Sequence, residues 1–504
     1  MKYILLMMIL SATVSCISQK KKQETLSVGI PGAWGDLIPS LQHTAYADAM
    51  LSNEFETLVT QDSTGITKGM VAKSWKITDN YKTIEFRIDT SKRFSNGDYI
   101  TAFDVKNSWE HSLSLKPVSS NSSVSDVLYK VVGYKNFKKT KKLSGLIVKD
   151  KETFIVKFNN PFRMVLENLT FSRLGVFKII NGEYIGTGPY KFVSKSKENA
   201  ILERNPYYGT DKGFEKIEFK HVSVSDAVQA LKDKKVQVFL FADKIQIDDC
   251  INKTGNIGCY LGNESSHFSL VVNGMKKSIF SNKNYRLALQ ALLLRDLKKD
   301  DIPASVKFSI RVDPQIYLPF QKGRLEPEEA KKIILSGEKY IPDLLKELKK
   351  KPLKLMTTKS TAWTIDYLKK KGVPLSEESR VYESKDIVDS YYKKYDADLI
   401  ALGMGVMSGD PDGIYHALGK KGSISSPMLA RELLGKLLEE GRTITDPKKI
   451  DQKYKEVSRA ALLDVPFIHF GFMRTRSAYR NDLIKVSHSI KRREDHAMLN
   501  FGPF

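Results

Sequence analysis

The sequence contains little of the material from which catalytic and metal sites are usually built. Its 504 residues include only three cysteines and eight histidines, and the histidines are dispersed along the chain. The patterns G-x-S-x-G and H-E-x-x-H and the Walker loop are all missing, which argues against a serine hydrolase, a zinc protease or a nucleotide-binding enzyme. We therefore expect no enzymatic activity, no cofactor and no metal site.

Long hydrophobic runs are missing as well. The first residues combine Lys2, the short apolar run Tyr3–Leu10 and then small residues, which is typical of a secretory signal and too short to span a bilayer. Cys16 follows directly, in a segment that resembles a lipobox. We expect residues 1–15 to be a signal peptide, Cys16 to carry lipid and residues 16–24 to form a tether; a plain secretory signal is the alternative.

If Cys16 is lipidated, Cys250 and Cys259 are the remaining cysteines, separated by a loop that contains two glycines. In an oxidising compartment we expect a disulfide that closes this loop, and two free thiols are the alternative. Metal binding by this pair is not expected, because no histidine lies near it at ligand spacing.

The net charge is strongly positive, at +23, from 81 basic and 58 acidic residues. No basic stripe interleaved with aromatic residues stands out, so we expect no nucleic-acid partner. Attraction of acidic ligands or of anionic lipid remains open beside the simpler reading of solvated surface lysines. The hydrophobic content of 41% is enough for packed cores, and the length suits about three domains.

The most informative segment is 54–113. Apolar and charged residues alternate over 84–89, the pattern of a half-buried strand, and Asn96-Gly97 predicts a turn. Thr101 with Asp104 three residues later resembles a capping box ahead of a helix.

As a string, this segment closely resembles the bacterial extracellular solute-binding proteins of family 5, the substrate-binding proteins of the peptide/nickel ABC transporter class. The matching residues are Leu58, Val59, Gly65, Ala72, Ser74, Trp75, Phe86, Phe94 to Asp98, Thr101, Ala102, Asp104, Val105, Ser108, Trp109 and Glu110. The turn at 186–190 (GTGPY) is similar to another family hallmark, and its glycines predict a close approach of backbone to backbone. The resemblance covers nearly the whole mature chain and is weakest at about 298–321.

This resemblance implies a two-lobed α/β fold of the type II periplasmic-binding-protein class, with an extra α+β domain and a cleft between the lobes. Two crossings of the chain, near residues 266 and 471, would form the hinge. The implied boundaries are 24–50, 180–265 and 472–504 for lobe I, 51–179 for the extra domain and 266–471 for lobe II.

The resemblance also implies a function. We expect an exported, membrane-anchored lipoprotein, facing the periplasm or the cell surface, that captures oligopeptides or peptide-like solutes as a monomer. It would deliver them to the permease and ATPase subunits of an ABC importer. The alternatives are the same fold binding a nickel chelate or a saccharide, or acting as a sensory or surface-interaction lipoprotein.

One loop departs from the family pattern. Peptide-binding members carry W-x-x-D-x-x-D-P-D, in which the first Asp takes the α-amino group of the ligand. Here Asp410 and Asp412 fall into register with D-P-D, while Met404 replaces the Trp and Met407 replaces the amine-binding Asp. Three explanations are open: the ligand lacks a free amine, another acid replaces that Asp, or the ligand is rich in apolar groups that suit a methionine wall. Core positions for the two methionines, in a shifted register, are the remaining alternative.

Three aromatic residues are further candidate ligand contacts. Trp34 follows the first predicted strand, where the first lobe of the family faces the cleft, and Tyr46 and Tyr415 are the other two. For each of them, packing or a surface role is the alternative. His416 as a nickel ligand would need partners that the dispersed histidines do not supply.

Overall fold

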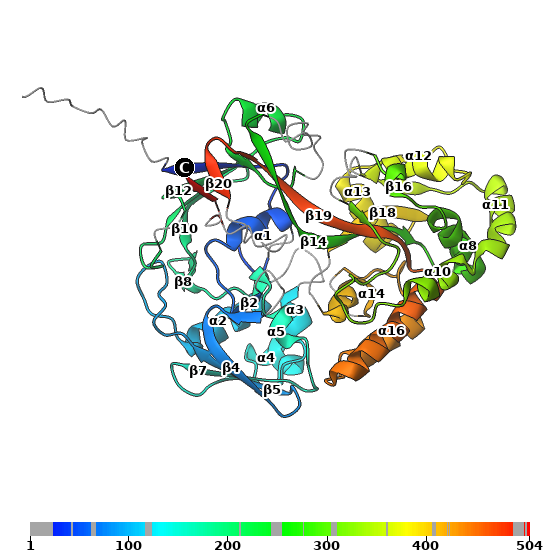
Figure 1. Ribbon diagram of the computed structural model, residues 1–504. Helices are drawn as coiled ribbons and strands as arrows, with labels where there is room; N and C mark the ends of the chain where they lie inside the picture. Colours follow the sequence, from blue (N-terminus) through cyan, green and yellow to red (C-terminus); the bar gives the residue numbers. More distant parts are fainter. Residues whose placement is uncertain are drawn as a thin grey trace, which may run out of the picture.

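The computed structural model shows an α/β molecule (Figure 1). It describes residues 24–41, 44–61, 67–115, 123–210, 213–242, 255–275, 277–303, 310–358, 361–405, 410–420, 422, 424–486, 498 and 501–503. Cys16, Met407 and Cys250, for which we predict lipid, ligand contact and a disulfide, lie outside these residues. Within the described part, no helix is both long and apolar enough to cross a membrane.

One sheet of eleven strands runs through the molecule. In spatial order its strands are β10 (Tyr190–Lys195), β11 (Asn199–Arg204), β12 (Lys216–His221), β1 (Thr25–Ile30), β13 (Val238–Phe239), β19 (Phe467–Arg480), β14 (Ile257–Val272), β18 (Leu399–Gly405), β16 (Leu355–Thr357) and β17 (Arg380–Val381), with β15 (Ile310–Val312) paired to β19. The long strands β14 and β19 pair antiparallel and link the left and right parts of Figure 1. They pass through the predicted crossings near 266 and 471; the domain boundaries themselves stay a prediction.

A smaller sheet lies in the lower left of Figure 1. Its strands, in order, are β4 (Ala72–Thr78), β5 (Thr83–Ile88), β7 (Thr153–Lys157) and β6 (Leu146–Val148), and α2 (Ala102–Ser114) packs against β6 and β7. The predicted strand is confirmed, because Ile84, Phe86 and Ile88 are fully buried. The capping box of Thr101 and Asp104 is also confirmed at the start of α2.

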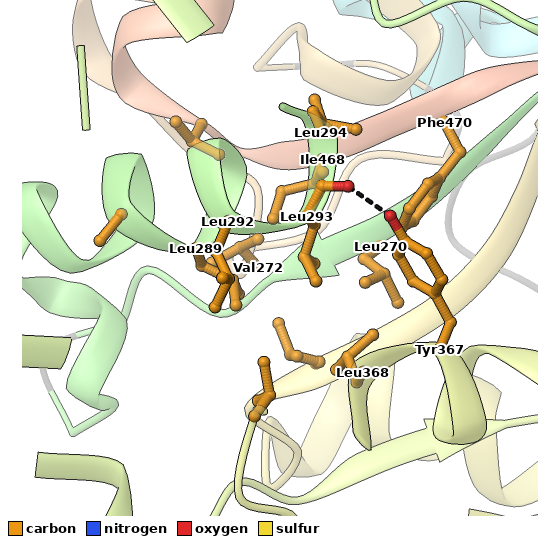
Figure 2. Packing of buried hydrophobic residues seen from close by; sticks show 14 of the residues in the cluster. Leu270, Val272, Leu289, Leu292, Leu293, Leu294, Tyr367, Leu368, Ile468 and Phe470 are labelled. Carbon is orange, nitrogen blue, oxygen red and sulfur yellow. Dashed lines mark hydrogen bonds between the residues drawn. The ribbon is translucent and has the colours of Figure 1, made fainter. Parts of the chain in front are cut away.

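The right part of Figure 1 is built from helices on both faces of the sheet. They are α8 (Lys283–Leu294), α10 (Pro327–Leu335), α11 (Ile341–Lys350), α12 (Trp363–Lys370), α13 (Ser384–Asp389), α14 (Tyr415–Leu418), α15 (Glu432–Gly441) and α16 (Pro447–Asp464). Figure 2 shows one of these faces, where side chains of β14 and β19 pack with α8 and α12, and the Tyr367 hydroxyl donates to the Leu293 carbonyl.

Side chains alternate across a strand, so neighbouring residues of β14 reach different cores. Val272 belongs to the cluster of Figure 2, whereas Val271 belongs to a second cluster with residues of α14, α15 and α16. At the start of helix α16, Asp446 caps the helix by accepting from the Lys448 amide at 2.8 Å, and Pro447 occupies the first turn.

The turn at 186–190 lies between β9 (Glu183–Ile185) and β10, at the edge of the large sheet. A Cβ atom on Gly186 would lie 1.9 Å from the Glu54 carbonyl oxygen, so only glycine fits there. The Gly188 amide donates to the Glu54 carbonyl at 2.8 Å, and the Tyr190 amide donates to the Asn53 carbonyl at 3.0 Å. The predicted close approach of backbone to backbone is therefore confirmed.

The remaining α-helices and β-strands of the described residues are short. They are α1 (Ala45–Leu51), β2 (Val59–Gln61), β3 (Thr67–Gly69), α3 (Ser123–Leu128), α4 (Phe137–Thr140), α5 (Val165–Asn168), β8 (Lys178–Ile180), β9 (Glu183–Ile185), α6 (Ala227–Lys232), β20 (Ile484–Val486) and β21 (Phe501–Pro503).

Candidate functional site

The segment Asp410-Pro411-Asp412 opens a short 3₁₀ turn, Pro411–Ile414, that leads into α14. The Asp412 amide donates to Oδ1 of Asp410 at 2.9 Å, so Asp410 caps this turn and Pro411 occupies its first position. The local chemistry of Asp-Pro-Asp therefore fixes the position of the Asp410 carboxylate.

The Asp412 carboxylate is buried and held from two sides within the right part of the molecule. Nε of Arg442 lies 2.9 Å from its Oδ2, and the Tyr454 hydroxyl donates to its Oδ1 at 2.8 Å. The Arg442 guanidinium in turn lies 3.7 Å from the ring centroid of Tyr415, whose hydroxyl donates to Glu439. Burial raises the pKa of Asp412, and Arg442 opposes that rise. Asp412 therefore has a structural role, because its carboxylate is fully engaged in stabilising the packing of Arg442 and Tyr454 around it.

Asp410 instead forms an ion pair with Arg163, which comes from the segment between the small sheet and α5. The two residues are 247 positions apart in the sequence. The exposed fraction is 8% for the Arg163 side chain and 16% for that of Asp410. Nε and Nη2 of Arg163 are buried without a hydrogen-bond partner among the described residues. The site therefore combines the Asp410 carboxylate with a guanidinium that has two N–H groups without a hydrogen-bond partner among the described residues.

Other contacts join the same two regions around this ion pair. The rings of Phe171 and His416 lie 5.8 Å apart, and the Thr445 hydroxyl donates to Asn80 at 3.3 Å. A cavity of about 630 Å³ also lies between these two regions, and it is lined by Tyr129, Lys130, Gly133, Lys135, Asn136, Asn159, Asn160 and Glu439. Polar side chains thus line the boundary between the predicted extra domain and predicted lobe II.

The predicted ligand contacts fall into two groups. Met404 and Tyr415 are buried in the cluster that packs on α15 and α16. Tyr415 also contacts Arg442, which pairs with Asp412. Trp34 and Tyr46 belong to the cluster around β1; the Trp34 indole donates to the Ser196 carbonyl at 3.0 Å. Among the described residues, the two groups belong to separate hydrophobic clusters, and the ligand roles of all four residues stay predictions.

Sequence reasoning missed Arg163, Arg442 and Tyr454. The available signal was weak: Arg163 is one cation within the apolar run Phe162–Leu166, and Arg442 directly follows a glycine at the end of α15. A charged residue in an apolar run indicates a buried partner but does not identify it.

A second buried pair lies where β14 and β19 run together. Nδ1 of His267 and Nε2 of His469 are 3.0 Å apart, and Met404 of β18 lies directly opposite His267. Burial lowers the pKa of His267 to about 3, and burial together with the neighbouring histidine lowers that of His469. Both imidazoles are therefore neutral at ordinary pH.

Neither a metal cluster nor a complete thiol pairing is found in the described part of the chain. No group of three or more His, Cys, Asp and Glu residues gathers there. Cys259 is disulfide-bonded, and because its partner lies outside the described residues, the pairing with Cys250 stays a prediction.

Comparison with known proteins places this geometry in context. The Periplasmic oligopeptide-binding protein OppA of Haemophilus influenzae is 31% identical over 172 residues, which span 31% of this chain and 32% of that protein. The match thus covers about a third of the curated relative.

Two solved structures share the fold over almost the whole chain. The binding protein DppA of Helicobacter pylori, in complex with the peptide STSA, is 17% identical with a TM-score of 0.77 over 97% of this chain and 99% of that one. NikZ of Campylobacter jejuni, in complex with Ni(L-His), is 17% identical with a TM-score of 0.71 over 95% and 99%. The expected periplasmic-binding-protein fold is therefore confirmed. The family model of the bacterial extracellular solute-binding proteins, family 5, matches residues 67–426, and the chain belongs to that family.

Proposed function

We propose that this protein captures peptides or peptide-like solutes between its lobes and delivers them to the permease and ATPase subunits of an ABC importer. The observation that carries the proposal is the family match over residues 67–426, together with a fold shared with a peptide-bound binding protein over 97% of the chain. The curated relative that is 31% identical over part of its length is itself an oligopeptide-binding protein.

The geometry at Asp410 supports capture by closure. The carboxylate lies in a loop of predicted lobe II and reaches Arg163, which belongs to the predicted extra domain. A solute that contacts both sides would favour the closed arrangement by the free energy of those contacts. The lining of the cavity between the same two regions includes three asparagines and two lysines, and such side chains can pair with peptide carbonyl and carboxylate groups.

The N-terminal segment supports export and anchoring. Residues 1–15 would be removed, Cys16 would carry the lipid, and residues 16–24 would tether the lobes to a membrane facing the periplasm or the cell surface. We infer a monomer, since capture between two lobes of one chain needs no second copy.

Native mass spectrometry tests the proposal. Protein that lacks residues 1–16, purified without denaturation, is incubated with a mixture of peptides and, in parallel, with Ni(II)–histidine and with a mixture of sugars. Adducts of peptide mass that are released on activation are the expected result. A mass shift only with the nickel chelate or only with a sugar would replace the peptide by that ligand. Protein that stays unshifted in all three mixtures would contradict solute capture and favour a surface-interaction role.

A further inference from the structure

Two exposed tyrosines lie on either side of one arginine at the surface of the molecule. Tyr99, between β5 and α2, is 52% exposed, and Tyr207, between β11 and β12, is 46% exposed. The guanidinium of Arg93 lies 4.1 Å from the ring centroid of Tyr99 and 5.9 Å from that of Tyr207, and it donates to the Tyr99 hydroxyl. Single exposed aromatic residues are ordinary, whereas two rings around one cation form a defined surface. We call these three residues the tyrosine patch.

The rings of the tyrosine patch are held in place although they face water. A Cβ atom on Gly97 would lie 3.0 Å from Cζ of Tyr207, so this ring packs against the backbone of the turn. Arg93 and Tyr99 also pair with one another in an antiparallel β-bridge. Side chains that are already ordered lose little conformational entropy when they contact a partner. The tyrosine patch is therefore suited to binding at its surface.

The net charge of the tyrosine patch is positive. Among the described residues, Arg93 donates to a hydroxyl and forms no ion pair. Asp98, beside the patch, pairs with Lys178 at 3.2 Å. Glu215 pairs with Arg204 at 3.1 Å. Tyrosines gather where a membrane meets water, and anionic lipids attract basic residues, so this combination of side chains suits the headgroup region of a membrane.

The chain enters the fold close to the tyrosine patch. The Glu215 amide donates to the Glu24 carbonyl at 3.0 Å, and the Arg204 amide donates to the Glu215 carbonyl at 2.9 Å. These three residues therefore lie in one row across neighbouring strands, and Tyr207 follows Arg204 by three residues. With about 4.8 Å between strands and at most about 3.6 Å per residue, the backbone of Tyr207 lies within about 25 Å of Glu24.

The predicted lipid anchor is tied to the same end of the sheet. Cys16 precedes Glu24 by eight residues, which span at most about 29 Å. Positions 20–22 in this segment are three consecutive lysines, which anionic lipid also attracts. A short tether keeps a weakly binding surface at a high effective concentration beside its partner. The membrane that holds the lipid is therefore the partner within reach of the tyrosine patch.

We propose that the tyrosine patch contacts the lipid headgroups of the membrane that carries the anchor. Arg93 lies beside anionic phosphates, and the rings of Tyr99 and Tyr207 lie at the interface between lipid and water. This contact fixes the orientation of the tethered molecule relative to the membrane. The proposal rests on the lipid anchor of the proposed function and does not depend on the identity of the solute.

Contact-dependent quenching tests the proposal on the complete mature lipoprotein in vesicles of phosphatidylcholine and phosphatidylglycerol. A thiol-reactive dye is attached through Pro206→Cys, next to the patch, or through Lys346→Cys in α11, at the opposite side of Figure 1; both positions are exposed, and Cys259 is disulfide-bonded. Lipids that carry a nitroxide on the headgroup quench a dye that touches the membrane surface. We expect quenching at position 206 and not at 346, and weaker quenching at 206 when phosphatidylglycerol is omitted.

Variants assign the contact to the tyrosine patch. Tyr99→Ser combined with Tyr207→Ser should lower the ratio of contacting to detached molecules roughly tenfold or more, because two rings are removed from the interface. Arg93→Gln keeps both rings and should lower this ratio roughly fivefold, which gives a second readout should the double variant fail to fold. Phe320→Ser is the matched control, since it removes an aromatic residue of predicted lobe II that is 71% exposed; it should keep the full quenching at position 206.

The outcomes separate this inference from the proposed function. A mature protein whose mass shows no lipid on Cys16 would overturn the proposed anchor, and the membrane contact with it. If the lipid is present but the dyes at 206 and 346 are quenched equally, the anchor stands and the contact of the patch is overturned. The same conclusion holds if the double tyrosine variant keeps the quenching at 206, or if Phe320→Ser lowers it as much.

Discussion

Glu54, in the segment between α1 and β2, provides a direct test of the packing of that segment against the turn at 186–190 and the start of β10. Its side chain is 3% exposed and accepts a hydrogen bond from the Phe192 amide at 3.2 Å. Burial raises the pKa of Glu54 from 4.5 to about 7, and Lys195 opposes the rise. A difference of this size corresponds to about 3 kcal/mol in the free energy of unfolding.

The sign of the effect follows from where the proton is bound. Below pH 4.5, the Glu54 carboxyl is protonated in both the folded and the unfolded protein, so it contributes no difference. Between pH 4.5 and about 7, the unfolded chain releases the proton while the folded protein keeps it, so the free energy of unfolding falls as pH rises. Above about pH 7, both states are ionised and the folded protein bears the full cost.

The substitution Glu54→Gln removes this titration and keeps an oxygen that can accept from Phe192. Compared with the wild type, the variant should gain about 3 kcal/mol of stability between pH 4.5 and pH 8. Urea unfolding followed by tryptophan fluorescence at several pH values measures the difference. Glu203→Gln, at an exposed glutamate, reports the effect of removing one surface carboxylate. A difference between Glu54→Gln and wild type that stays constant with pH would refute the reasoning.

Three further substitutions test other parts of the structure. Gly186→Ala should destabilise the protein by about 1 to 3 kcal/mol or more in urea unfolding, because its Cβ would meet the Glu54 carbonyl; unchanged stability would contradict the close approach. Arg442→Met should lower the free energy of unfolding by about 3 to 5 kcal/mol, because it leaves the Asp412 charge buried without its partner. Adding Asp412→Asn should recover much of that loss in thermal unfolding; no recovery would contradict a buried ion pair. His267→Phe should gain about 2 to 3 kcal/mol relative to wild type from pH 6.5 to pH 4.5, because the unfolded His267 binds a proton there and the folded one does not; a constant difference would argue against a buried neutral imidazole.

Features that depend on near neighbours in the sequence could be predicted. The buried face of β5, the capping box of Thr101 and Asp104, and the start of α16 at Asp446 all follow from interactions within a few residues. The glycines of the 186–190 turn indicated a close approach, although not that Glu54 would be the partner. Local signals predict such helices, strands and turns, whereas the two-lobed fold class came from the resemblance of the whole string to the family.

The candidate site could not be predicted in the same way. Arg163 meets Asp410 across 247 residues, and His267 meets His469 across 202. No periodicity or spacing connects such residues, since the topology of the large sheet and the position of the small one decide which side chains meet. Met404 illustrates the limit: a methionine wall and a core position are equally compatible with the sequence, and the structure buries this residue opposite His267.

The two aspartates of the Asp-Pro-Asp segment illustrate how place decides the role of a charge. Asp412 and Arg442 lie within one predicted lobe, so opening of a cleft would not separate them, and their pairing maintains that lobe. Asp410 lies in predicted lobe II and Arg163 in the predicted extra domain, so an opening between these two parts would return both side chains to water, where hydration replaces the lost attraction. A buried ion pair therefore contributes little net free energy to closure, whereas an apolar side chain buried at the same place would favour closure by about 2 to 3 kcal/mol. A nearly balanced equilibrium leaves the choice between open and closed states to the contacts that a ligand adds, which is the condition for capture and release.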